Sequence, residues 1–260
     1  MIGFWLLIAA AAPHAATAEA EGTALEAPTW LDFLHRMPWW PDWLPVQFAW
    51  SLVVIALLGL LCFFGTRRMQ RVPRGLQNML ETIVQALAGF IDGIMGSAGR
   101  PFVPFLGTLF IYIAFMNLIG LLPGFGSPTA NLNTTLSMAI IVFFLVQYHS
   151  LRQNGLVGYI KHFIGEPWWL FFIMLPLHII SELVRPITLA LRLFGNIQGE
   201  EIAIFSFIML AAALPLYLRW LPLQLPMMLL ALLTSLLQAL VFVLLTSLYL
   251  TLASPEHESH

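Results

Sequence analysis

Charged residues are scarce in this chain: only 9% of its 260 residues are Asp, Glu, Lys or Arg, whereas 60% are hydrophobic. A single cysteine, Cys62, excludes an internal disulfide framework. The sequence has no phosphate-binding glycine loop, no Cys/His metal spacing and no nucleophile signature around its serines. These absences argue against conventional catalysis and predict no cofactor, no bound metal and no nucleic-acid partner. Long uncharged apolar runs remain, and they are typical of a polytopic membrane protein built from α-helices.

The apolar runs predict an all-α integral membrane protein, with about five transmembrane or steeply tilted helices in a domain of residues 46–254. The runs are residues 46–65, 102–122, 134–148, 167–216 and 221–252. The fourth run is roughly twice as long as a perpendicular span requires, so it is either a steeply tilted helix or a segment lying partly in the membrane plane. Residues 75–95 mix polar and apolar side chains at helical spacing, which favours one amphipathic surface helix on the cytoplasmic side.

The basic residues predict the orientation of the chain. Four arginines within residues 67–74 follow the first apolar run, and such clusters stay on the cytoplasmic side of a membrane. The loop at 123–133 contains no Lys or Arg, whereas the loop expected at 149–162 contains one of each. This alternation places the N-terminus outside and the tail of residues 255–260 in the cytoplasm.

Two segments precede the first expected span. Residues 1–18 fit either a signal peptide, with small residues at 16–18 for cleavage, or an unstructured N-terminus. Residues 19–45 are rich in tryptophan and proline, which is typical of a segment in the headgroup region. We therefore expect an outer interfacial segment there.

The stretch HIISELVRPITLALRLFGNIQGEEI at 178–202 gathers ionisable side chains in the most hydrophobic half of the chain. Such groups are costly at membrane depth and usually mark an ion path or a paired site. Helical spacing places one polar stripe on one face, made of His178, Glu182, Arg185, Arg192 and Asn196. Glu200 lies near the edge of the stripe, and Glu201 projects to the opposite face, where a water-filled cavity suits a carboxylate best. Pro186 is expected to kink or locally unwind the helix between the two arginines.

Some polar residues of this region have two interpretations. The last apolar run contains Gln238 and Ser235, whose side chains either belong to a functional site or join neighbouring helices by hydrogen bonds. His178 is either a functional group at membrane depth or a packed, hydrogen-bonded core residue.

Five motifs in order resemble the a subunits of F-type ATP synthases. They are VPRGLQNMLE at 72–81, MNLIGLLPG at 116–124, NLNTTLSMA at 131–139, an RP pair followed by LRLFGN within 185–196, and Gln238 followed by ALVFVLLTSLYL. The resemblance covers nearly all of the chain from residue 46 onward. It implies a proton-translocating stator subunit of the Fo sector that does not bind nucleotide, in a bacterial inner membrane. The partners that it implies are the c-subunit ring, with the last two helices tilted against it, the b-subunit peripheral stalk, the F1 sector through the assembled complex, and the lipid bilayer.

The resemblance also implies roles for individual residues. Arg192 holds the position of the essential arginine that faces the ring, between two offset aqueous half-channels, and Arg185 and Ser235 are supporting residues. The half-channel candidates are Glu201, Glu200, Asn196, Gln238, His178, Glu182, Asn131 and Asn133. Asn131 and Asn133 either line the outer entrance or simply cap and turn the chain.

One departure from the family pattern concerns the carboxylates. Glu200 stands where some relatives have a small residue, and Ala231 stands where a polar or ionisable side chain occurs. Glu200 therefore either takes over a relay function that Ala231 cannot perform or neutralises local positive charge. Which of Glu200 and Glu201 is the main relay stays open. A secondary transporter with an intramembrane charged site is the main alternative function, and a purely structural membrane anchor is a third.

Overall fold

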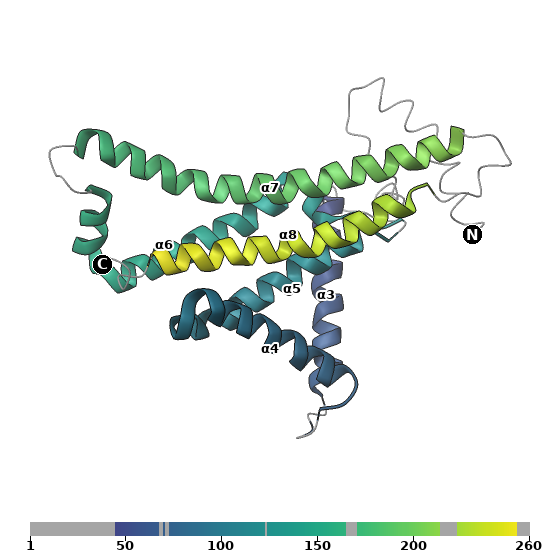
Figure 1. The fold of residues 1–260 in the computed structure, drawn as a ribbon, viewed down its shortest axis with the longest axis horizontal. Helices are drawn as coiled ribbons and strands as arrows, with labels where there is room; N and C mark the ends of the chain where they lie inside the picture. Colours follow the sequence, from purple (N-terminus) through teal and green to yellow (C-terminus); the bar gives the residue numbers. More distant parts are fainter. Residues whose placement is uncertain are drawn as a thin grey trace. The chain divides into compact units, whose positions relative to one another are not determined.

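The computed structural model describes residues 45–67, 70, 73–122, 124–164, 171–213 and 223–253. These parts form helices and no strand (Figure 1). The α-helices are α3 (Val46–Thr66), α4 (Leu76–Met95), α5 (Val103–Ile119), α6 (Leu132–Ile164), α7 (Phe171–Ala213) and α8 (Leu225–Leu252), with short 3-10 helices η1 (Gly96–Phe102) and η2 (Pro128–Ala130). The expected segments 1–18, 19–45 and 255–260 lie outside the described residues, apart from residue 45.

Five of these helical stretches are long and apolar enough to cross a membrane. They are Val46–Thr66, Ala98–Ile119, Leu132–Gln153, Phe172–Ala211 and Leu225–Leu252. A helix makes its backbone hydrogen bonds internally, so such a stretch can lie in lipid without leaving backbone polar groups unpaired. The prediction of an all-α chain with about five spanning helices is confirmed.

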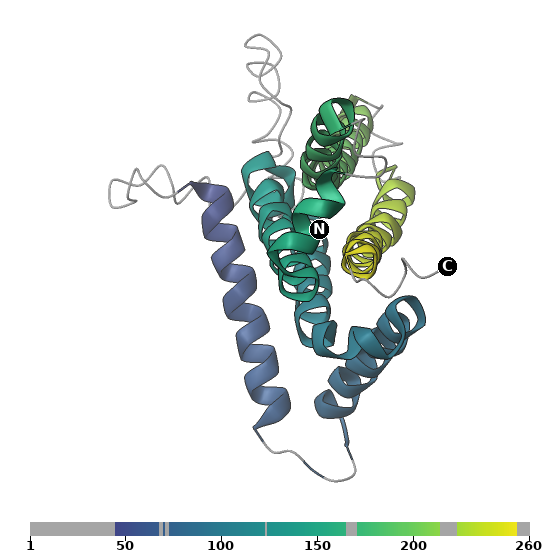
Figure 2. The same ribbon diagram turned by 90° about the vertical axis from the view of Figure 1, so that its left-hand side faces the viewer.

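Helix α4 is the one α-helix of the described chain that is not a candidate span. It buries Leu87, Ile91 and Met95, which recur every four residues and so lie along one side of the helix. Polar side chains such as Gln85 and Glu81 lie among the rest of its residues. Helix η1 folds against α4 directly after it (Figure 2). The predicted amphipathic helix at 75–95 is therefore present.

The chain divides into two compact units, each built from separate stretches of sequence. Among the described residues, the first unit comprises 45–61, 112–134, 194–213 and 223–239. The second unit comprises the described residues of 62–111, 135–193 and 240–253. In the first unit the rings of Trp50 and Phe125 lie 4.9 Å apart between centroids. In the second unit the fully buried side chains include Ile91, Leu106 and Phe242.

Helix α6 continues well beyond the expected end near Tyr148, so the predicted loop at 149–162 is wrong. The helix runs to Ile164 and changes direction at Gly155, which has φ 66° and ψ 174° (Figure 1). Residues 149–154 contain neither glycine nor proline, so nothing in the backbone stops the helix before Gly155. The left-handed φ at Gly155 is readily reached only by a residue without a Cβ atom.

Helix α7 is a single helix of 43 residues that contains both Pro176 and Pro186. Pro186 was expected to kink or locally unwind the helix; the helix continues through this residue without unwinding, and a kink there stays a prediction. A proline ring removes one backbone donor but fixes φ close to the helical value, which allows the helix to continue where neighbouring packing supports it. The long apolar run therefore forms one helix that carries the whole polar stripe.

Candidate functional site

The second unit holds an ion pair on α7. Arg185 Nη1 lies 2.8 Å from Glu182 Oε1, one helical turn away. Gln147 on α6 donates a hydrogen bond from Nε2 to Glu182 Oε2 at 2.9 Å. The guanidinium carbon of Arg185 lies 5.3 Å from the centre of the Tyr249 ring on α8. Glu182 is thus held by both an arginine and an amide, and Arg185 also makes a cation–π contact.

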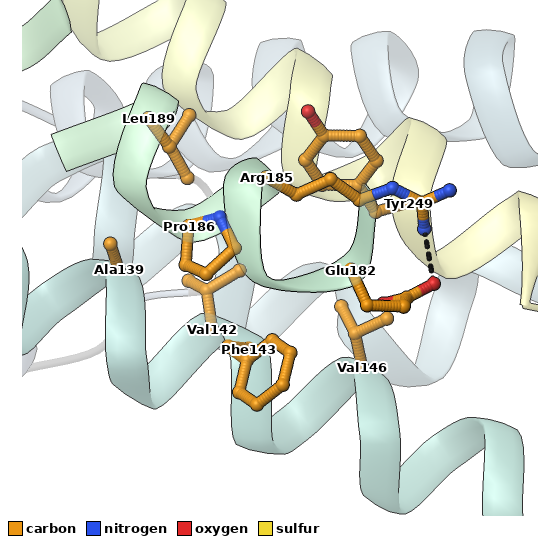
Figure 3. A pocket seen from close by; sticks show the side chains of 9 residues that line it. All are labelled: Ala139, Val142, Phe143, Val146, Glu182, Arg185, Pro186, Leu189 and Tyr249. Atoms are coloured by element: carbon orange, nitrogen blue, oxygen red, sulfur yellow. Dashed lines mark hydrogen bonds and ion pairs between the residues drawn. The ribbon is translucent and has the colours of Figure 1, made fainter. Parts of the chain in front are cut away.

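Glu182, Arg185 and Tyr249 line a small cavity, which Figure 3 shows from close by. Its volume is about 20 Å³, which is enough for roughly one water molecule. The polar residues of its lining are Glu182, Arg185 and Tyr249. The remaining lining residues are Ala139, Val142, Phe143, Val146, Pro186 and Leu189. Almost all of the surface that faces this cavity is apolar, so it offers water few hydrogen-bond partners.

The other two stripe residues of the second unit are His178 and Arg192. His178 is half-buried and makes an interaction with its surroundings. Arg192 is exposed, and no described residue forms a hydrogen bond or ion pair with it. The two arginines of α7 therefore differ: Arg185 is neutralised within the chain, and Arg192 presents its charge outward.

In the first unit, α7 and α8 are joined by a pair of amides. Asn196 Nδ2 donates to Gln238 Oε1 at 2.9 Å, and the Gln238 side chain is buried. Two further polar atoms of α8, Gln238 Nε2 and Ser235 Oγ, are buried without a hydrogen-bond partner among the described residues. Buried polar atoms usually have partners, so these two indicate a place for water or for a group from outside the chain.

The two adjacent glutamates of α7 have different neighbours. The Glu200 carboxyl lies near the Thr234 hydroxyl of α8, which donates to the Leu230 carbonyl of its own helix at 3.0 Å. Glu201 Oε1 accepts a hydrogen bond from the backbone N–H of Ser127 at 3.2 Å. The prediction that the two carboxylates project in different directions is confirmed. The sequence predicted a water-filled cavity around Glu201. In the structure its neighbour is the α5–α6 loop, which the sequence analysis had not considered.

A hydrogen-bond network in this loop was missed by sequence reasoning. Ser127 Oγ donates to the Met116 carbonyl at 3.0 Å and lies 2.7 Å from Thr129 Oγ1. Thr129 donates to Asn117 Oδ1 at 2.7 Å, and Asn117 Nδ2 donates to the Ser235 carbonyl at 3.2 Å. The three side chains of the network, Asn117, Ser127 and Thr129, are all buried. Their sequence signal was weak, because small polar residues in a loop usually indicate only a turn.

Asn131 and Asn133 lie at the start of α6. Asn131 Oδ1 accepts a hydrogen bond from the backbone N–H of Asn133 at 2.9 Å, and Asn133 is exposed. This geometry is that of a helix N-cap. The structure therefore gives Asn131 a capping contact, which corresponds to the second of its two expected interpretations.

No group of three or more His, Cys, Asp or Glu side chains that could hold a metal ion occurs in the part of the chain that the structure describes. The polar groups above consist of one ion pair, one exposed guanidinium, two carboxylates, and amides and hydroxyls at membrane-spanning depth. Such an arrangement can bind water, hold charges in place and pass protons between neighbouring carboxyl groups.

Comparison with known proteins identifies the family. Residues 48–251 match the family described as ATP synthase A chain. The chain belongs to this family. It is 42% identical over 233 residues to ATP synthase subunit a of Protochlamydia amoebophila, which covers 86% of this chain and 83% of the relative. It is 44% identical over 205 residues to ATP synthase subunit a 3 of Pelobacter propionicus, with 79% and 85% covered.

A third relative, ATP synthase subunit a of Solidesulfovibrio magneticus, is 44% identical over 206 residues, which is 79% of this chain and 82% of the relative. Membership of the ATP synthase A chain family confirms the resemblance drawn from the five motifs. It makes the chain a multi-pass membrane subunit that conducts protons and is not the catalytic subunit of the complex. The secondary transporter and the structural anchor are thereby excluded.

Proposed function

We propose that Arg192 is the arginine through which this proton-translocating stator subunit acts on a ring of c subunits. The observation that carries the proposal is the contrast between the two arginines of α7. Arg185 is paired with Glu182 inside the chain, whereas the exposed Arg192 has no ion-pair partner among the described residues. A guanidinium at membrane depth stays charged and requires an anionic partner. A carboxyl group of a neighbouring subunit supplies that partner.

Two groups of polar residues provide the proton path on either side of Arg192 along α7. The outer group consists of Glu201, Glu200, Asn196 and Gln238 in the first unit, with the unpartnered atoms of Gln238 and Ser235 as places for water. The inner group consists of Glu182 and His178 in the second unit, next to the cavity of about 20 Å³. The inner group precedes Arg192 in the sequence and the outer group follows it, as two offset half-channels require.

The charge of Arg192 couples proton transfer to rotation. A proton from the outer group neutralises an ionised ring carboxylate, which then leaves Arg192 and enters the lipid. A protonated ring carboxyl arriving from the other direction gives its proton to the inner group, and the resulting carboxylate pairs with Arg192. Arginine has no ready proton to release near neutral pH, so the guanidinium blocks a direct leak between the two groups.

The proposal includes partners and an orientation. The c-subunit ring lies against the exposed face of Arg192 on α7, and the b-subunit peripheral stalk and the F1 sector join through the assembled complex. The arginines at 67–74 and the C-terminus face the cytoplasm of a bacterium, and the N-terminus faces outward. The outer group of carboxylates then opens to the outside.

The test is to replace Arg192 in the intact ATP synthase and to measure ATP-driven proton pumping and passive proton leak in membrane vesicles. Arg192→Ala should abolish coupled pumping while the complex stays assembled, because an ionised ring carboxylate loses its partner in a medium of low dielectric constant. Arg192→Lys should also fail, since an ammonium is a compact charge with a different reach. Arg185→Ala is the matched control and should impair pumping less. Normal coupled pumping by an assembled Arg192→Ala enzyme would overturn the proposal.

A further inference from the structure

We propose that Ser127 is a positioning residue for Glu201: its backbone N–H fixes the carboxylate in the orientation that accepts and releases protons. This inference rests on the proposed function of Glu201 in the outer half-channel and deepens it. It assigns a function to the α5–α6 loop, residues 120–131, which the charged stripe of α7 did not suggest.

The loop holds the Ser127 N–H rigidly. The Ser127 side chain is buried, and its hydroxyl donates to the Met116 carbonyl at 3.0 Å and lies 2.7 Å from Thr129 Oγ1. Thr129 is fully buried and donates to Asn117 at 2.7 Å. Asn117 in turn donates to the Ser235 carbonyl of α8 at 3.2 Å. Because every side chain in this series is fixed by another, the loop cannot turn its N–H away without breaking buried hydrogen bonds.

Close backbone packing adds to this rigidity. A Cβ atom at Gly120 would lie 2.6 Å from Ser127 Cβ and 3.2 Å from Ser127 N. Only glycine allows the loop to approach the end of α5 so closely. The position of the Ser127 N–H therefore depends on the tight fit between Gly120 and Ser127 as well as on the hydroxyl groups.

The two neighbouring carboxylates differ in the kind of donor that they face. Glu201 accepts from a backbone N–H, which has one fixed direction, whereas the Thr234 hydroxyl near Glu200 donates to carbonyls of its own helix. In the described part of the first unit, Glu200 and Glu201 are the only Asp, Glu, Lys, Arg or His residues. No described residue of this unit carries a basic side chain, and the loop N–H donates to Glu201 from a fixed direction.

The experiment removes the N–H without forcing the backbone into a new conformation. Ser127 has φ −77° and ψ 120°, which are values that proline adopts. Ser127→Pro removes both the N–H and the hydroxyl, whereas Ser127→Ala removes the hydroxyl and keeps the N–H. The comparison of the two variants in the intact complex isolates the N–H. Proton flow is measured in vesicles as a function of pH, with the amount of assembled complex determined separately.

We expect Ser127→Pro to slow proton flow by about tenfold to a hundredfold relative to Ser127→Ala, since a small misplacement of a reacting group has effects of this size. The pH profile should move to higher pH more in Ser127→Pro than in Ser127→Ala, which keeps the N–H but loses its anchoring hydroxyl, because a donor to a carboxylate favours its ionised form. In the Glu201→Gln background the two Ser127 variants should behave alike in their pH dependence. The opposite outcome is equal rates and equal pH profiles for Ser127→Pro and Ser127→Ala while Glu201→Gln is defective. That result would overturn the positioning function of Ser127 and leave the proposed function of Glu201 intact.

A second pair of variants tests the inference if Ser127→Pro does not assemble. Thr129→Val keeps the shape of the side chain but removes the hydroxyl shared by Asn117 and Ser127, and should slow proton flow and shift its pH profile. Thr129→Ser keeps the hydroxyl and should restore both. Thr108→Val is the control, because the Thr108 hydroxyl is exposed and bonds only within α5. Wild-type rate and pH profile in Thr129→Val would contradict the proposal. Normal flow in Glu201→Gln would instead refute the underlying function of Glu201.

Discussion

Replacing Arg185 by alanine should destabilise the folded chain, whereas the same change at Arg192 should not. Arg185 makes an ion pair at 2.8 Å with Glu182 and a cation–π contact at 5.3 Å with Tyr249. The side chains of Arg185 and Glu182 are 35% and 18% exposed, so solvent screens the pair only in part. Arg192 is exposed and makes no such contact with any described residue.

The size of the effect follows from these contacts. A partly screened ion pair contributes about 0.5–1 kcal/mol, and a cation–π contact at such a site contributes a similar amount. Without Arg185, Glu182 keeps the hydrogen bond from Gln147. The free energy of unfolding should therefore fall by about 1–2 kcal/mol, equivalent to a decrease in Tm of about 2–8 °C for a chain of this length.

The assay is the loss of helical circular dichroism on heating the purified full-length chain in detergent micelles. Arg192→Ala is the matched control, because it removes the same side chain from the same helix. Its Tm should stay within about 2 °C of the wild type, as expected for a surface substitution without lost contacts. Equal Tm values for Arg185→Ala and Arg192→Ala would show that the Glu182–Arg185–Tyr249 contacts do not stabilise the fold.

Two further predictions concern the carboxylates and the orientation. Glu201→Gln should slow proton flow more than Glu200→Gln, because a fixed backbone N–H orients Glu201; unimpaired pumping in both variants would mean that neither is a relay. In a Cys62→Ala background, a cysteine placed at residue 70 or 257 should resist a membrane-impermeant thiol reagent added from outside. Modification from that side would reverse the proposed topology.

Most of the fold could be predicted because hydrophobic runs and helix length are local properties of the sequence. The run from Val46 onward gave the correct first helix, and the helix at 75–95 was recognised from its mixed polarity. The errors occurred where a helix passes a residue that is expected to interrupt it. Helix α6 passes the residues after Tyr148 and changes direction only at Gly155, and α7 continues through Pro186.

The candidate site was predictable only in part. Charged residues stand out in an apolar chain, so the sequence identified Arg192, Glu201 and their neighbours on α7 without any structure. The pairing of Asn196 with Gln238 depends on how two helices pack, and helical periodicity contains no information about that contact. The contact between Ser127 and Glu201 involves a backbone N–H, which every residue except proline carries, so no side-chain pattern could have revealed it.

The uninterrupted length of α7 determines how its charges are distributed in the membrane. Its candidate span of 40 residues measures about 60 Å at the rise of an α-helix. Such a helix fits within a hydrocarbon layer of about 30 Å only when its axis lies about 60° from the membrane normal. At that angle the ten residues from Glu182 to Arg192, about 15 Å along the axis, separate the two side chains by about 7 Å in depth and about 13 Å sideways. The helix thus spreads its ionised groups mainly parallel to the membrane plane, which is the direction in which the proposed c-subunit ring carries its carboxyl groups.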